Sequence, residues 1–218
     1  MIVIEYTLSF PGRYIAEPYW PEMARLIDIQ KESGVNRARS DASRRKTLDA
    51  YLSSHGMTLA EYEQLEKDAR RPFHTDQSGQ IIIPGDRVAS FAVCCCHQAR
   101  SAQRPCPPDQ MRSTFTFTDA ETGKHQRDGV WERFAVVSSG TGAKLSNQRG
   151  LRQSSYIEHF DATGMVEFDE TFVKPSKLRD LFNWGGENVG IGASRKMGVG
   201  RFNVSSWRVD GQPSEVAA

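Results

Sequence analysis

The chain contains no apolar run that approaches the roughly 20 residues of a membrane-spanning helix. Its first residues, Met1 to Tyr6, also lack the basic region and the long apolar core of a secretion signal. With 38% hydrophobic and 25% charged residues, the composition is typical of a soluble globular protein. We therefore expect a cytoplasmic protein with no membrane partner.

Cysteine is scarce, and its spacing does not suit a metal site. The four cysteines are Cys94, Cys95, Cys96 and Cys106. Three of them are adjacent, which fits neither a disulfide framework nor the CxxC pairs of a structural zinc site. Cys96, His97 and Cys106 form an alternative set of metal ligands. Apolar residues recur at helical spacing from Val88 to Ala99, however, which favours cysteines that fill a helix interface. We expect no metal and no cofactor.

Catalytic motifs are also missing. The sequence contains no nucleophile elbow, no HExxH and no paired-carboxylate motif. None of the five histidines lies in a motif that marks it as catalytic; they are His55, His74, His97, His125 and His159. We therefore assign no catalytic residue.

Net charge is close to zero, but the charges are segregated along the chain. The net charge is +1, which points to no particular partner. One segment holds five basic residues against the single acid Asp41; the five are Arg37, Arg39, Arg44, Arg45 and Lys46. Such a cluster creates a local positive field that suits phosphate. The alternative is a solvated helix face, which is what most charge runs are.

Hydrophobic periodicity predicts an α+β fold. Apolar residues alternate from Ile2 to Phe10, as in a half-buried strand. Residues 19–72 follow a helical pattern, with a capping box formed by Thr58 and Glu61, so we expect a helical basic insertion there. Further strands are expected at 81–83, 114–118, 130–137, 156–160, 165–172 and 201–209, and helices at 86–100 and 176–184. We expect loops at 138–152 and 161–164.

This order of elements predicts one domain over residues 1–218. We expect a ferredoxin-like, or RRM-like, antiparallel sheet with helices on one face and the helical insertion after the first strand.

Six of the 18 glycines fall between Gly185 and Gly200, in the stretch GGENVGIGASRKMGVGRFNV. Glycine allows backbone amides to approach a phosphate closely and reaches positive φ at little cost. The stretch is neither a P-loop nor a dinucleotide fingerprint, because Met197 follows Lys196 and Arg195 occupies the place of the last glycine. Our candidate anion ligands are Gly190, Gly192, Arg195, Lys196, Gly198, Gly200 and Arg201. The alternative is a tight connection in which the glycines permit close packing.

The stretch VGIGASRKMGVGRFNV, between a short helix and a final strand, resembles the carboxyl-terminal glycine-rich motif of the RAMP superfamily. These are ferredoxin-like RNA-binding proteins of CRISPR effector complexes. A second stretch, IIIPGDRVASFAVCC, is similar to the strand, Pro-Gly and helix of their backbone subunits. Phage-encoded proteins of the same build also exist. Backbone subunits are commonly longer than 218 residues, so we expect their thumb-like hairpin to be reduced or replaced.

The resemblance implies a non-catalytic subunit that binds single-stranded RNA, or alternatively DNA, along its backbone. It also implies self-association or assembly with other CRISPR-type subunits. Tyr14, Tyr19 and Trp20 are candidates for base stacking, although core or loop packing is the favoured interpretation for Tyr19 and Trp20. Two alternatives stay open: a metal-independent CRISPR RNA endoribonuclease with a histidine as acid or base, and a phage interaction protein that imitates a backbone subunit.

Overall fold

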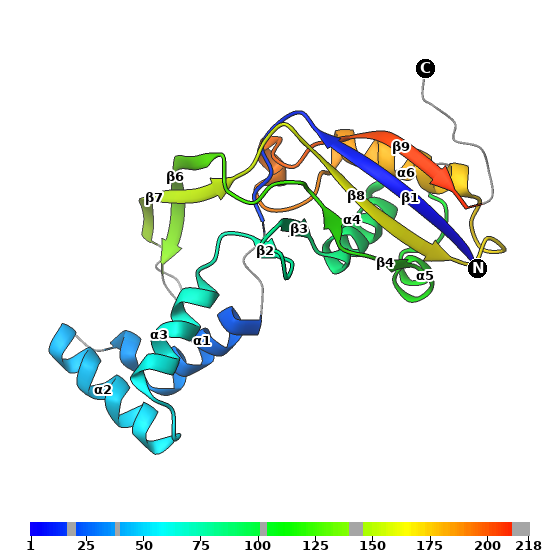
Figure 1. Cartoon of the computed structure of the whole chain (residues 1–218). Helices are drawn as coiled ribbons and strands as arrows, with labels where there is room; N and C mark the ends of the chain where they lie inside the picture. Colours follow the sequence, from blue (N-terminus) through cyan, green and yellow to red (C-terminus); the bar gives the residue numbers. More distant parts are fainter. Residues whose placement is uncertain (17–20, 38–39, 101–103, 140–145, 211–218) are drawn as a thin grey trace. The chain divides into compact units, whose positions relative to one another are not determined.

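The computed structural model of the chain describes residues 1–16, 21–37, 40–100, 104–139 and 146–210, with the side chains of 36 and 134–152 outside the description. The contacts divide the chain into two compact units (Figure 1). One comprises residues 1–16 and 73–218, and the other residues 17–72. The first unit contains the sheet and the glycine-rich stretch, and the second contains the expected helical insertion.

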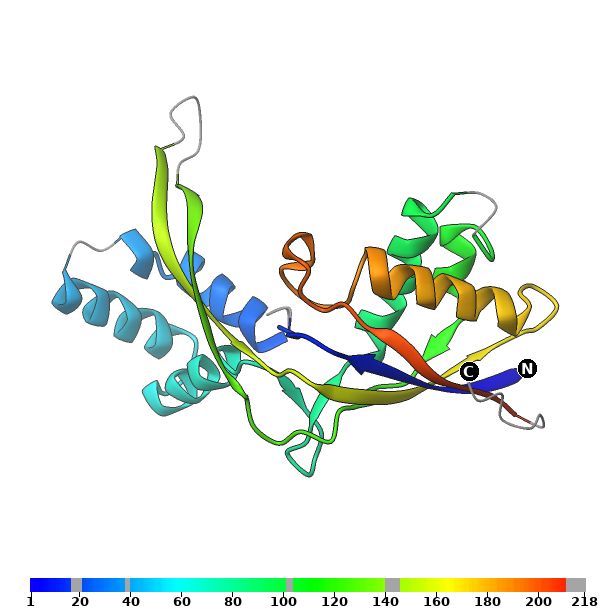
Figure 2. The same cartoon turned by 90° about the horizontal axis from the view of Figure 1, so that it is seen from above.

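The sheet of the first unit is antiparallel throughout its described pairings. Its strands are β1 (Ile2–Phe10), β2 (His74–Thr75), β3 (Ile81–Ile83), β4 (Thr116–Phe117), β5 (Ala120–Glu121), β8 (Phe160–Phe168) and β9 (Asn203–Val209). Their order is β2-β3-β5-β8-β1-β9, and β4 also pairs with β8. The helices α4 (Gly85–Gln98) and α6 (Pro175–Asn188) cover one face of this sheet (Figure 2). Central β1 and β8, flanked by β9 and by β4 and β5, reproduce the ferredoxin-like arrangement and confirm the expected fold class.

Alternation in the sequence explains which face of the sheet is covered. Ile4, Tyr6, Leu8 and Phe10 of β1 are all 1% exposed or less and form the core with the helices. The same alternation runs through the whole of β8, where every second residue is buried. The sheet therefore has one packed face and one open face.

Three glycines that we expected outside helices and strands lie inside them. The helix that we expected at 176–184 continues through Gly185 and Gly186, which lie inside α6. A Cβ at Gly185 would overlap the Cys95 sulfur of α4, and one at Gly186 would overlap the Phe202 carbonyl oxygen. These glycines bring α6 close to its neighbours. Gly164, which we expected in the loop 161–164, lies within β8, where a Cβ would sit 2.7 Å from the Tyr6 hydroxyl.

The segment that we expected to be a basic loop is partly a strand. β6 (Gly129–Ser139) and β7 (Ser146–Tyr156) form a two-stranded hairpin in continuous register. The sequence of β7, SNQRGLRQSSY, is too polar for periodicity to indicate a strand. The expected strand at 114–118 is also shorter than predicted, because Pro107 and Pro108 open the helix α5 (Pro108–Thr114).

The second unit is helical and has its own small core. It contains α1 (Pro21–Glu32), a 3-10 turn (Val35–Arg37), α2 (Asp41–Ser54) and α3 (Leu59–Ala69). The buried core residues are Leu26, Ile29, Leu52, Tyr62, Leu65 and Ala69. The predicted capping box is confirmed: Glu61 N–H donates to Thr58 Oγ1 at 3.2 Å, and Thr58 N–H donates to Glu61 Oε2 at 2.7 Å. Across the described residues, no helix of either unit has the length and apolar character needed to cross a membrane.

Candidate nucleic-acid interface

The glycine-rich loop connects α6 to β9 and is held by backbone hydrogen bonds. Ile191 N–H donates to Gly200 O at 2.9 Å, and Ala193 N–H donates to Ile15 O at 2.8 Å. A 3-10 turn (Arg195–Met197) lies between these anchors, flanked by Ser194 and Gly198 in the left-handed region. These hydrogen bonds therefore fix the two ends of the loop, and the 3-10 turn lies between them.

Most of the loop glycines have an internal structural role. A Cβ at Gly192 would overlap the Ile15 carbonyl oxygen, and one at Gly200 would overlap the Ile191 carbonyl oxygen. The amides of Gly190, Gly198 and Gly200 donate to the carbonyls of other residues of the protein. These glycines thus shape the loop, and their contact with a nucleic acid stays a prediction. Gly198 differs, because a Cβ there would meet open space.

A pocket of about 220 Å³ lies beside this loop. Its lining residues are Cys94, Gln98, Asn188, Val189, Arg195, Lys196 and Arg201. The structure therefore brings together the three cations that the sequence singled out, and adds the carboxyl-terminal parts of α4 and α6. Sequence reasoning missed Cys94, Gln98 and Asn188, because only the fold places them beside the loop.

The pocket is positively charged, because three of its seven lining residues are cationic and none is acidic. Arg195 Nη1 lies 4.0 Å from Cys94 Sγ. The Arg201 Nη1 atom is buried and, within the described residues, makes no hydrogen bond. A buried guanidinium nitrogen without a partner is costly.

A stack of alternating aromatic and cationic side chains lies at the base of the β6–β7 hairpin. The Arg13 guanidinium lies 4.6 Å from the ring centroid of Tyr156 and 5.7 Å from that of Trp131. Arg133 lies 5.0 Å from the same Trp131 ring, and its Nη1 lies 2.7 Å from Met197 Sδ. Cation–π contacts hold the stack together, and the contact of Arg133 with the Met197 sulfur joins it to the glycine-rich loop. The spacing of Trp131 and Arg133, two residues apart on one strand face, is the sequence signal that could have indicated it.

The open face of the sheet is poorly suited to nucleic acid. In β1 and β8 it carries Glu5, Asp161 and Glu167, together with a hydrogen-bonded pair, Thr7 and Thr163. Within β1, β8 and β9, all of which are described, no aromatic side chain faces this side. Arg208 of β9 is the cation of this face and pairs with Glu5 at 3.4 Å, so carboxylates outnumber cations on these three strands. A face of this charge without stacking platforms disfavours a phosphate-bearing nucleic acid.

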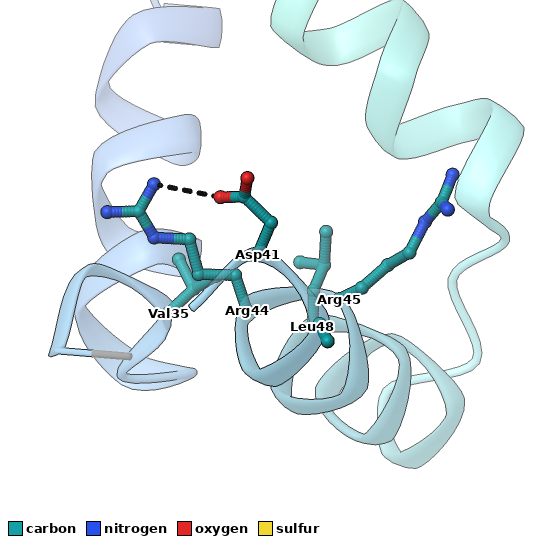
Figure 3. Close-up of a pocket in the computed structure, with 6 residues that line it drawn as sticks. Val35, Asp41, Arg44, Arg45 and Leu48 are labelled. Carbon is teal, nitrogen blue, oxygen red and sulfur yellow. Dashed lines mark ion pairs between the residues drawn. The ribbon is translucent and has the colours of Figure 1, made fainter. Parts of the chain in front are cut away.

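The arginine segment belongs to the helical unit (Figure 3). Arg44 and Arg45 project from the first turns of α2 beside a pocket that Val35, Asp41, Ala42 and Leu48 also line. Arg44 pairs with Asp41 at 3.7 Å, an exposed contact of little energetic weight. Lys46 is exposed on the same helix, Arg37 ends the 3-10 turn, and Arg39 lies outside the described residues.

Tyr14 is not available for base stacking. Its side chain is 1% exposed and packs edge-on against Phe10 and Phe160 in the core. The prediction that it stacks on a base is wrong, because the chain after β1 turns inward and pairs with Ile157. Tyr19 and Trp20 lie outside the described residues.

The cysteines behave as core residues. Cys95, Cys96 and Cys106 are buried, and burial raises the pKa of the Cys95 thiol. Cys94 is partly exposed and lines the cationic pocket. Among the residues that the structure describes, no group of three or more His, Cys, Asp or Glu side chains is placed to hold a metal ion.

Comparisons with known proteins leave the chain unassigned. No protein-family model matches it, and no curated protein sequence matches it. Among solved structures it is similar to a chain of the cryo-EM structure of Type III-B Cmr-beta bound to cognate target RNA, with a TM-score of 0.49 and 10% identity. The match covers 95% of this chain and 60% of that chain. At this identity and TM-score, the likeness assigns neither a family nor a function to this chain.

Proposed function

We propose that this protein is a non-catalytic subunit that binds single-stranded nucleic acid, RNA above all, along its sugar-phosphate backbone. The observation that carries the proposal is the pocket beside the glycine-rich loop. Three cations from one loop meet there, without any acid in the lining. The loop also carries the motif that resembles the RAMP superfamily, within a ferredoxin-like fold.

Arg195, Lys196 and Arg201 are suited to holding phosphates. Guanidinium groups bind phosphate oxygens bidentately, and a lysine contributes a mobile point charge. Contacts of this kind position a strand without reading its bases. Gly198, with its open flank, allows the strand to approach the loop closely.

The arginine segment of the helical unit is proposed as a second phosphate-binding element. Its exposed cations suit sequence-independent binding in the same way. The protein would act within a multi-subunit or filamentous CRISPR-like complex, through self-association or contacts with other CRISPR-type subunits. It would be either a component of such a system or a phage-encoded relative.

The test removes two pocket cations and measures binding at several salt concentrations. Arg195→Ala with Lys196→Ala should weaken binding of a labelled single strand by about 1–3 kcal/mol, the scale of one or two charge-assisted hydrogen bonds. The slope of log K against log salt should fall by about 0.7 for each phosphate that the variant no longer neutralises. The matched control is Lys174→Ala with Lys177→Ala, which removes the same charge at the opposite end of α6, about 20 Å along the helix.

Equal losses of affinity in the two double variants would show that the pocket does not bind the strand. A second readout locates the binding site directly. Cys94 is the one cysteine of the four that is not buried, and it lines the pocket. A bound strand should therefore slow the labelling of its thiol by a maleimide.

The endoribonuclease alternative gains no support from the described residues. The histidines are dispersed: His74 lies in β2, His97 in α4, His55 at the end of α2, and His125 and His159 in connections. None lines the cationic pocket. A phage protein that imitates a backbone subunit would bind no single-stranded nucleic acid. The ultraviolet absorbance ratio of the purified protein shows whether nucleic acid co-purifies, and it therefore separates this alternative from the proposed function.

A further inference from the structure

Two side-chain amides lie in the cationic pocket, and both are oriented by hydrogen bonds. Gln98 Nε2, at the end of α4, lies 3.0 Å from Cys94 Sγ, to which it donates. Asn188 Nδ2, at the end of α6, donates to the Trp184 carbonyl oxygen at 2.8 Å. Each amide nitrogen is thus directed back onto its own helix.

The amide oxygens of Gln98 and Asn188 therefore give the pocket hydrogen-bond acceptors in addition to its cations. In the described parts of the chain, the Gln98 and Asn188 amide oxygens accept no hydrogen bond, and both side chains are exposed to the pocket. A phosphate has only acceptor oxygens at neutral pH, so it satisfies Arg195 and Arg201 but cannot satisfy these amides. The complementary ligand therefore carries a hydrogen-bond donor close to its anionic group.

A ribonucleotide has this combination, and a deoxyribonucleotide lacks it. The 2′-hydroxyl lies on the sugar that the phosphates join, and it is the group by which a protein distinguishes RNA from DNA. The pocket has a volume of about 220 Å³, which is larger than the space that a single water or a lone ion requires.

We propose that the amide oxygen of Asn188 or of Gln98 accepts the one hydrogen bond that a ribose 2′-hydroxyl donates, so that this pocket selects RNA over DNA. The inference rests on the proposed function, because the cations must first hold the phosphate. Arg195, Lys196 and Arg201 then supply affinity for RNA and DNA alike, and the amide oxygen that accepts from the 2′-hydroxyl supplies the preference for RNA.

The experiment compares three oligomers of one sequence: RNA, DNA and 2′-O-methyl RNA. The base sequence of the oligomers contains only adenine and cytosine, so no thymine methyl group affects the comparison of RNA with DNA. The parent protein should bind RNA about 3- to 10-fold more tightly than the other two, the effect of one hydrogen bond. The 2′-O-methyl strand keeps the ribose but cannot donate.

At least one of Asn188→Leu and Gln98→Met should reduce the RNA preference, and both should leave DNA affinity within about 2-fold, because neither changes the charge. Asn183→Leu is the matched control, since Asn183 is exposed on the same helix but does not line the pocket. It should keep the full preference. Arg195→Ala with Lys196→Ala should weaken RNA and DNA binding alike.

Two results would overturn the inference. The first is equal binding of RNA and DNA by the parent, and the second is a full RNA preference in both amide variants. A parent protein that binds no single strand overturns the proposed function as well, whereas equal binding of RNA and DNA overturns this inference alone.

Discussion

Two glycines of the loop should respond very differently to the same substitution. Gly198 has φ +78 and Gly200 has φ +75, so alanine at either position incurs the same left-handed penalty of about 1–2 kcal/mol. A Cβ at Gly198 meets open space, and the cost ends there. At Gly200 the Cβ overlaps the Ile191 carbonyl oxygen, so the backbones of the two residues must separate.

This separation sets the magnitude of the difference. It strains the hydrogen bond from Ile191 N–H to Gly200 O, 2.9 Å long, worth about 1 kcal/mol. The accompanying shift of a packed region adds about 1–3 kcal/mol. Gly200→Ala should therefore lower the free energy of unfolding by about 3–6 kcal/mol, and Gly198→Ala by about 1–2 kcal/mol. For a chain of this size, each kcal/mol lowers Tm by about 2–4 °C.

Differential scanning calorimetry of the two variants and the parent measures the effect. The chain forms two compact units, so the relevant transition is that of the unit containing the sheet. We expect Tm to fall by about 2–8 °C for Gly198→Ala and by at least about 4 °C more for Gly200→Ala. Equal shifts would show that the contact with Ile191 does not constrain the loop, and the packing account of these glycines would fail.

Two further predictions concern the arginine segment and an acidic side chain. Replacing Arg37, Arg39, Arg44 and Arg45 by alanine should weaken binding of all sequences alike and flatten its salt dependence; an unchanged salt slope would show that the segment does not contact phosphate. Asp128 accepts a hydrogen bond from Glu158 N–H at 2.8 Å, which holds its pKa below the usual value, with Lys124 adding to the effect. Its stabilising contribution is present above the unfolded pKa of about 4 and is lost as pH falls through the lower folded pKa. Asp128→Asn should therefore reduce the fall in Tm between about pH 5 and pH 2, and an unchanged acid profile would contradict this.

The fold class could be read from local patterns because those patterns have short-range causes. Alternation in Ile2–Phe10 identifies a strand with one buried face wherever that strand lies in the sheet. The capping box of Thr58 and Glu61 identifies a helix start because both partners lie within four residues. The cationic cluster of the glycine-rich loop was also visible, because three of its members lie within seven residues of one another.

Tertiary packing decided what those patterns could not. Gly185 and Gly186 resemble a helix end in sequence, but α6 continues through them, and the absence of a Cβ lets Cys95 and Phe202 pack against its backbone. The polar strand β7 has no apolar periodicity, and its pairing with β6 defines it.

The pocket follows the same rule. Its cations come from the loop, but Gln98 lies about 100 residues earlier in the chain, at the end of another helix. Residue types and their local spacing determined where positive charge would gather. Only the packing of α4 against α6 determined which neutral side chains would stand beside it, because that neighbourhood depends on contacts between segments distant in the sequence.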